Sequence, residues 1–181
     1  TFNISSLDEM DYAIDLIKQA YNYNEEYLEN KGKGRSARHD KRFDFWKGLL
    51  EVAKEKNADF QNLSPSIYHW IGKGGGKSGI SFNFLILNKY AGIEVYLDIR
   101  DKGVNKKRFD FLMEHKKEIE DIFEDSLIWE RLDSKRACRI GYKFENVGLK
   151  DKDSWKDLQQ KLVVKMMKLK KAFGKFIDDL E

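Results

Sequence analysis

The sequence predicts an α+β domain in which helices pack on one face of a mainly antiparallel, four-stranded sheet. Two observations carry this prediction. Apolar and polar residues alternate along 80–86 and 93–100, and a period of two is typical of strands with one buried face. Apolar residues recur at spacings of three and four along 155–180, which is typical of a long amphipathic helix. The expected order of elements is α-ββ-α-ββ-α, ending in that long helix.

The first half of the domain is expected to form a helix and a hairpin. An apolar stripe around Trp46 predicts a helix over about 38–56. The segment 57–72 carries the only proline and is expected to be a loop, and GKGGGKSG at 72–79 is expected to be a flexible turn. The two strands follow, joined by a short connection at 88–92.

The second half is expected to repeat this order. The helical spacing of Phe109 and Leu112 predicts one helix over about 105–124. A second hairpin joins LIWERL to RACRIGYKF through 133–135. The stripe of the C-terminal helix either packs on the sheet of its own chain or forms the seam of a homo-oligomer, because coiled coils use the same spacing.

Composition and charge exclude several classes of protein. Of the 181 residues, 41% are hydrophobic and 36% are charged, so we expect a folded core rather than a disordered chain. The net charge of +3 is too small for a global attraction to nucleic acid. A single cysteine, Cys138, rules out an internal disulfide, and no apolar run is long enough to span a bilayer. These features predict a soluble, cytoplasmic domain without membrane contact.

A series of short motifs follows the start of the first predicted helix. They are FW at 45–46, SP…W at 64–70, SG at 78–79, E-x-Y-x-D at 94–98, NK at 105–106 and WERLD-x-x-RA-x-RI at 129–140. In order and wording they resemble the uncharacterised bacterial and archaeal family called domain of unknown function 4268. That resemblance implies a C-terminal attachment to larger proteins, many of which carry predicted nuclease or restriction-type domains linked to phage defence. It implies no established reaction.

The N-terminal segment has a different character. Ser6 and Glu9 form a capping box, and residues 1–25 resemble the closing strand and helix of a second family, domain of unknown function 5655. We therefore expect a remnant of a preceding domain at 1–25, a basic linker at 26–40 and the α+β domain at 41–181. The chain is expected to be a piece of a longer protein, whose other domains would be its partners.

Basic side chains gather in the expected linker and at its end. They are Lys31, Lys33, Arg35, Arg38 and Arg42. The segment is either a flexible arm that follows phosphates or an ordinary solvated connection between domains.

The polar face of the predicted sheet is the second candidate region. Tyr96, Arg100, Arg139 and Lys143 are expected on the face that the helices leave uncovered. This face is either ordinary solvated surface or a platform on which Tyr96 stacks with a base and the three cations contact phosphates.

The glycine-rich turn carries Lys73 and Lys77. It is not a phosphate-binding loop of the nucleotide-binding kind, because it precedes a strand rather than a helix and lacks the first glycine of that motif. A backbone nest that contacts an anion remains open, beside the simpler role of a turn that leads into the strand.

The spacing of Glu94, Asp98 and Arg100 is the one pattern that bears on catalysis. Metal-dependent nucleases place acidic residues and a lysine along adjacent strands. Arginine stands here where a lysine is usual, and it does not release a proton near neutrality. The three histidines lie in separate elements without metal-ligand spacing, so neither a metal nor a cofactor is expected.

The sequence therefore predicts a non-catalytic accessory domain that assists nucleic-acid binding within a protein of the restriction or phage-defence type. A protein-interaction or oligomerisation module is the first alternative. A metal-dependent nuclease with an atypical active site is the second.

Overall fold

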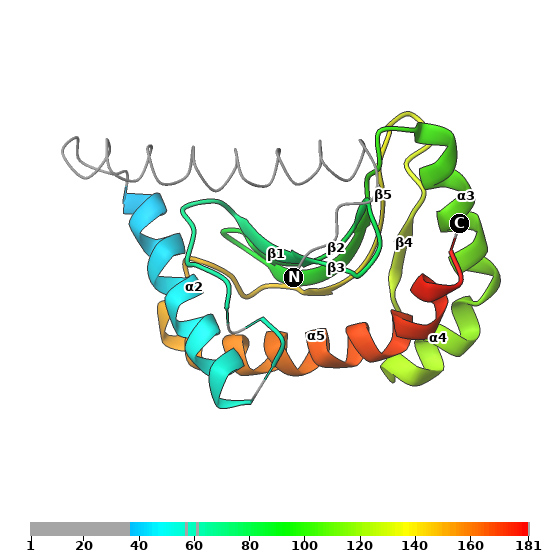
Figure 1. Cartoon of the computed structure of the whole chain (residues 1–181). Helices are drawn as coiled ribbons and strands as arrows, with labels where there is room; N and C mark the ends of the chain where they lie inside the picture. Colours follow the sequence, from blue (N-terminus) through cyan, green and yellow to red (C-terminus); the bar gives the residue numbers. More distant parts are fainter. Residues whose placement is uncertain (1–36, 57, 61, 181) are drawn as a thin grey trace. The chain divides into compact units, whose positions relative to one another are not determined.

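The computed structural model describes residues 37–56, 58–60 and 62–180 (Figure 1). Residues Lys41–Glu181 form one compact unit, which contains most of helix α2. The elements are α2 (Ala37–Glu55), β1 (Trp70–Gly74), β2 (Ile80–Ile86), β3 (Ala91–Leu97), α3 (Lys102–Glu114), α4 (Lys116–Phe123), β4 (Ile128–Glu130), β5 (Cys138–Phe144), a 3-10 turn η1 (Lys152–Ser154) and α5 (Trp155–Asp178). The predicted α+β class is confirmed.

The sheet has five strands, in the order β1-β2-β3-β5-β4, and every neighbouring pair is antiparallel. The prediction of four strands was wrong because Trp70–Gly74, expected as loop and turn, pairs with β2 as an edge strand. Ile71, opposite Phe84, is the only side chain of β1 that reaches the core. With one buried residue, β1 shows no alternation of apolar and polar residues in the sequence. The strand is defined only by its pairing with the edge of β2.

The core lies between the convex face of the sheet and the helices, with α5 running along that face (Figure 1). Leu162, Met166, Leu169 and Phe173 on α5 are completely buried in the same cluster as the inward side chains of the strands. Each such side chain stabilises the fold by roughly 1.5–3 kcal/mol. The predicted stripe thus covers the sheet of its own chain, and an oligomer formed through this helix stays a prediction.

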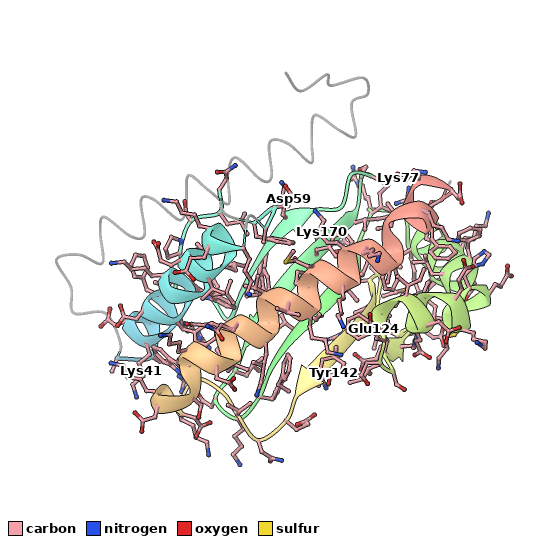
Figure 2. The ribbon with its side chains drawn as sticks, turned by 90° about the horizontal axis from the view of Figure 1, so that it is seen from below. Lys41, Asp59, Lys77, Glu124, Tyr142 and Lys170 are labelled. Carbon is pink, nitrogen blue, oxygen red and sulfur yellow. The ribbon has the colours of Figure 1, made fainter. Side chains whose placement is uncertain are left out.

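Helix α5 is also tied to its neighbours by polar contacts. Gln159 donates from Nε2 to the carbonyl oxygen of Phe45 in α2 at 2.8 Å. Figure 2 shows α5 lying across the strands, with Lys170 beside Asp59. Although α5 has 24 residues, neither it nor any other helix in the described part of the chain is long and apolar enough to cross a membrane.

The helix expected over 105–124 is divided in two. Asp101 begins α3, because its carboxylate accepts hydrogen bonds from the backbone N–H groups of Gly103 at 2.6 Å and Val104 at 3.2 Å. His115 separates α3 from α4, and its ring packs between Phe111 and Phe176 with centroid distances of 4.9 and 4.8 Å. The break lets α4 take its own direction while the apolar spacing continues.

Candidate functional site

A single row of residues crosses the concave face of the sheet, opposite to α5. In the strand register, Gly72 pairs with Asn83, Asn83 with Glu94, and Glu94 with Gly141. Two polar side chains in the middle of the sheet therefore have a glycine on each side. Because glycine leaves no side chain above the sheet, the surface is low along this row.

Asn83 and Glu94 of this row line a concavity of about 370 Å³. Its lining residues are His69, Trp70, Ser81, Asn83, Leu85, Leu87, Tyr90, Glu94, Tyr96 and Arg139. Trp70, Tyr90 and Tyr96 supply aromatic side chains to this lining, beside Leu85 and Leu87, and Trp70 at the edge strand is 39% exposed. The volume is within the range of about 300–1,000 Å³ that is usual for small-ligand sites. No helix in the described part of the chain covers this face (Figure 1).

The lining of the concavity contains a buried polar pair. Asn83 and Glu94 are only 6% and 7% exposed, and Asn83 Nδ2 donates to Glu94 Oε1 at 3.2 Å. Asn83 Oδ1 has no hydrogen-bond partner among the described residues. A Cβ atom added at Gly72 would lie only 2.0 Å from Asn83 Oδ1, so glycine is required at position 72.

Burial raises the pKa of Glu94, and the hydrogen bond from Asn83 and the charge of Arg139 oppose that rise. The nearby charge of Glu130 adds to it. The charge of Arg139 is shared with a second carboxylate, because its Nε contacts Glu130 Oε2 at 3.2 Å. Contacts within the chain thus offset only part of the cost of burying the Glu94 carboxyl group, and such a cost lowers stability.

Three of the predicted nucleic-acid contacts share this face. Tyr96 and Arg139 are opposite one another in the β3–β5 register, and both line the concavity. Lys143 lies further along β5, with its Nζ 5.3 Å from the ring centroid of Tyr90. Tyr96, Arg139 and Lys143 therefore lie on one face, where the charge of Arg139 is partly balanced by Glu130.

Other predicted contacts lie elsewhere. Lys73 points to the helix-covered side, where its Nζ is 2.6 Å from Asp59. Lys77 is in the turn after β1, and Arg100 is exposed beyond the end of β3. Arg42 donates to the carbonyl oxygen of Ile67 at 3.4 Å.

Arg42 and the other basic residues of the expected linker do not lie together at one site. The charge of Arg42 contributes, after burial, to a lowered pKa of His69 at the rim of the concavity. Arg38 is exposed in the first turn of α2. Lys31, Lys33 and Arg35 lie outside the described residues.

The candidate catalytic residues are not brought together. Glu94 lies in β3 and Asp98 follows the last residue of that strand, so the two are separated by roughly 13 Å along an extended chain. The Asp98 carboxylate accepts two hydrogen bonds from Arg136, at 2.6 and 2.8 Å. Among the residues that the structure describes, no group of three or more histidine, cysteine or acidic side chains has a metal-binding arrangement.

The NK motif has a structural role at the other end of the sheet. Lys106 is 8% exposed and donates to the carbonyl oxygens of Arg131, Leu132 and Ala137 at 2.6–3.0 Å, and to Cys138 Sγ at 3.2 Å. These bonds hold the connection between β4 and β5. Burial raises the pKa of the Cys138 thiol, which accords with a structural rather than a reactive cysteine.

Sequence reasoning missed three aromatic residues of the lining, His69, Trp70 and Tyr90. His69 precedes β1, Trp70 begins it and Tyr90 precedes β3, so none of them carries a periodic signal. A glycine inside a strand was the available indication, since it marks close approach of another group. Gly72 fits that rule once β1 is recognised as a strand.

Comparison with known proteins gives one family. Neither the curated proteins nor the solved structures provide a match to the chain. The resemblance of residues 1–25 to the second family stays a prediction, and those residues lie outside the described part. The family model described as "Domain of unknown function (DUF4268)" matches residues 41–177, which confirms the main resemblance, and the chain therefore belongs to that family.

Proposed function

We propose that the domain is a non-catalytic accessory module that binds unstacked bases of nucleic acid on its concave sheet face. The observation that carries this proposal is that three aromatic side chains, Trp70, Tyr90 and Tyr96, line one concavity together with polar residues. Its parent would be a larger cytoplasmic protein of the restriction or phage-defence type, as the family resemblance implies.

Two physical arguments favour nucleic acid. Aromatic rings on an antiparallel sheet are stacking surfaces, and stacking contributes roughly 1–3 kcal/mol per base. Arg139 and Lys143 place cations beside the rings, where the phosphates of a strand would pass. The single-stranded form is favoured because bases stacked inside a duplex cannot enter a concavity.

Anisotropy titrations of the whole chain test the proposal. We expect labelled single-stranded DNA or RNA to bind more tightly than the corresponding duplex, with an affinity that falls as salt rises. Dissociation constants on the order of 10⁻⁴–10⁻⁶ M are expected, because few phosphates are contacted. Trp70→Ala should weaken single-strand binding by roughly tenfold, the equivalent of losing one stacked base.

Met167→Ala provides the matched control. Met167 is 43% exposed on α5, so this change removes a comparable exposed apolar side chain from the opposite side of the sheet. Binding should be unaffected. Absence of binding to any nucleic acid at low salt would contradict the proposal and favour the protein-interaction alternative.

A further inference from the structure

We propose that the concave face selects RNA over DNA, because the carboxyl group of Glu94 binds the 2′-hydroxyl group of a ribose that lies above Gly141. This inference rests on the proposed function, since the ribose is taken to belong to the bound single strand. It distinguishes two kinds of strand that stacking on aromatic rings does not separate, because every base has a face that stacks.

The carboxyl group of Glu94 has one oxygen that remains accessible. Asn83 Nδ2 donates to Glu94 Oε1. In the described part of the chain Glu94 Oε2 accepts no hydrogen bond, yet it is not among the fully buried side-chain atoms that lack a partner. Glu94 Oε2 therefore keeps contact with solvent, and it does so from the concavity that Glu94 lines.

The cations of this face lie along one strand. Lys143, Gly141 and Arg139 alternate on the concave side of β5, and Gly141 is opposite Glu94 in the register. Lys143 and Arg139 are thus roughly 13 Å apart along the strand, one on each side of the glycine. Because cations contact the phosphates of a strand, we place its backbone along β5, over Gly141.

The apolar and aromatic side chains lie on the other side of Glu94. Trp70 in β1 is opposite Leu85 in β2, and both line the concavity. In the sheet, β3 lies between β5 on one side and β2 and β1 on the other. Glu94 in β3 therefore separates the cations from the surface that would receive the bases. The sugar, which joins a base to its phosphates, belongs in that position.

The surface beside Glu94 has room for a sugar. A Cβ atom added at Gly141 would lie 2.7 Å from the carbonyl oxygen of Ile93 and 3.2 Å from Glu94 Cβ, so this position requires glycine. A second hollow, of about 80 Å³, adjoins the concavity, and Tyr90, Glu94 and Arg139 line both. The carboxyl group thus lies at the boundary of two hollows, as a sugar between two bases would.

The chemistry of Glu94 favours a ribose at this boundary. A carboxylate repels the phosphates of a strand, and covering it without a donor adds the cost of desolvation. A ribose supplies a hydroxyl group there, whereas a deoxyribose supplies only C–H groups. Burial raises the pKa of Glu94, and a hydroxyl group can bond to either form of the acid because it both donates and accepts.

Anisotropy titrations of the wild-type chain with three labelled strands of one base test the inference. The strands are oligouridine, oligodeoxyuridine and 2′-fluoro-oligouridine, with every sugar changed so that no strand can slide to an unmodified position. Oligouridine should bind roughly tenfold more tightly than oligodeoxyuridine, the size expected for one hydrogen bond to a charged group. The 2′-fluoro strand keeps a ribose-like sugar conformation without an O–H donor, so it should bind like the deoxy strand.

Glu94→Leu then identifies the residue responsible. This change removes the acceptor and keeps a side chain of similar bulk, so ribose and deoxyribose strands should bind alike. Glu114→Leu is the matched control, because Glu114 is exposed at the end of α3 and does not line the concavity. It should retain the preference for ribose. Thermal melts check that both variants fold, and the comparison of strands on the wild type stands without them.

The outcomes separate this inference from the proposed function. If the deoxy strand bound as tightly as oligouridine or more tightly, ribose selection would be overturned and nucleic-acid binding would stand. Tight binding of the 2′-fluoro strand would also overturn it, because sugar conformation rather than the hydroxyl donor would set the preference. A ribose preference that persists in Glu94→Leu would overturn the role of Glu94. No binding of any strand would overturn both proposals.

Discussion

Two clusters of buried polar groups lie on this sheet, and they differ in how completely they are satisfied. At one end, Lys106 has four acceptors, and the side chain of Asn105 exchanges hydrogen bonds at 2.8 Å with both backbone groups of Ile99. In the middle, Asn83 and Glu94 share one bond of 3.2 Å, and the amide oxygen is left without a partner among the described residues.

The difference indicates that buried polar groups have different roles in the two clusters. Desolvation of a polar group is offset in the first cluster by bonds within the chain, so that cluster stabilises the β4–β5 connection. In the second cluster the offset is incomplete, which is typical of groups that meet an external partner. Substitutions in the two clusters should therefore change stability in opposite directions.

The largest effect is expected from Lys106→Met. This change keeps the length of the side chain and removes the donor from three buried or half-buried carbonyl oxygens. Denaturant unfolding should show a loss of about 2–4 kcal/mol, because each unsatisfied group costs about 1–3 kcal/mol. Lys107→Met, at the neighbouring exposed position, should stay within about 0.5 kcal/mol of the wild type. If the two changes had equal effects, the hydrogen bonds of Lys106 would not be what stabilises this end of the sheet.

A smaller loss is expected from Gly72→Ala. The new Cβ would stand 2.0 Å from Asn83 Oδ1 and 2.8 Å from the carbonyl oxygen of Phe82, so both the amide and the strand must shift. Overpacking of this kind costs about 1–3 kcal/mol in thermal or denaturant melts. Gly74→Ala, in the same strand with no atom within 4 Å, is the control and should be close to neutral. A neutral Gly72→Ala would show that this part of the sheet is looser than its geometry indicates.

The smallest effect, and the one with reversed sign, is expected from Glu94→Gln. Burial raises the pKa of Glu94 above its usual value of 4.5, with Asn83 and Arg139 opposing and Glu130 adding to that rise. The contribution of Glu94 to stability is therefore complete at pH below 4.5 and is lost as the pH rises through the raised pKa. Glutamine does not ionise, so it avoids this loss.

Melting temperatures of the two proteins across the acidic to neutral range check the sign. The variant should melt close to the wild type at the acidic end and above it near neutrality, with the gap widening as pH rises. A variant that melts lower at neutral pH would mean that ionised Glu94 stabilises the fold, and the contrast with Lys106 would fail.

Much of the fold could be predicted because its signals are local. The alternation along 80–86 and the stripe of α5 each depend on residues a few positions apart. The candidate site was half predicted, since Tyr96, Arg139 and Lys143 were expected on the open face. Trp70, Tyr90 and the low glycine row were not, because their role depends on which strand lies beside which.

The sequence by itself determined the α+β class, the helix-covered face and the family, because periodicity and motif order are properties of the chain alone. Tertiary structure decided the fifth strand, the partners of each charge and the row that joins Gly72, Asn83, Glu94 and Gly141. Register between strands fixes which side chains meet, and register depends on contacts between residues far apart in sequence. The buried Glu94 and the amide of Asn83 become neighbours only at that level.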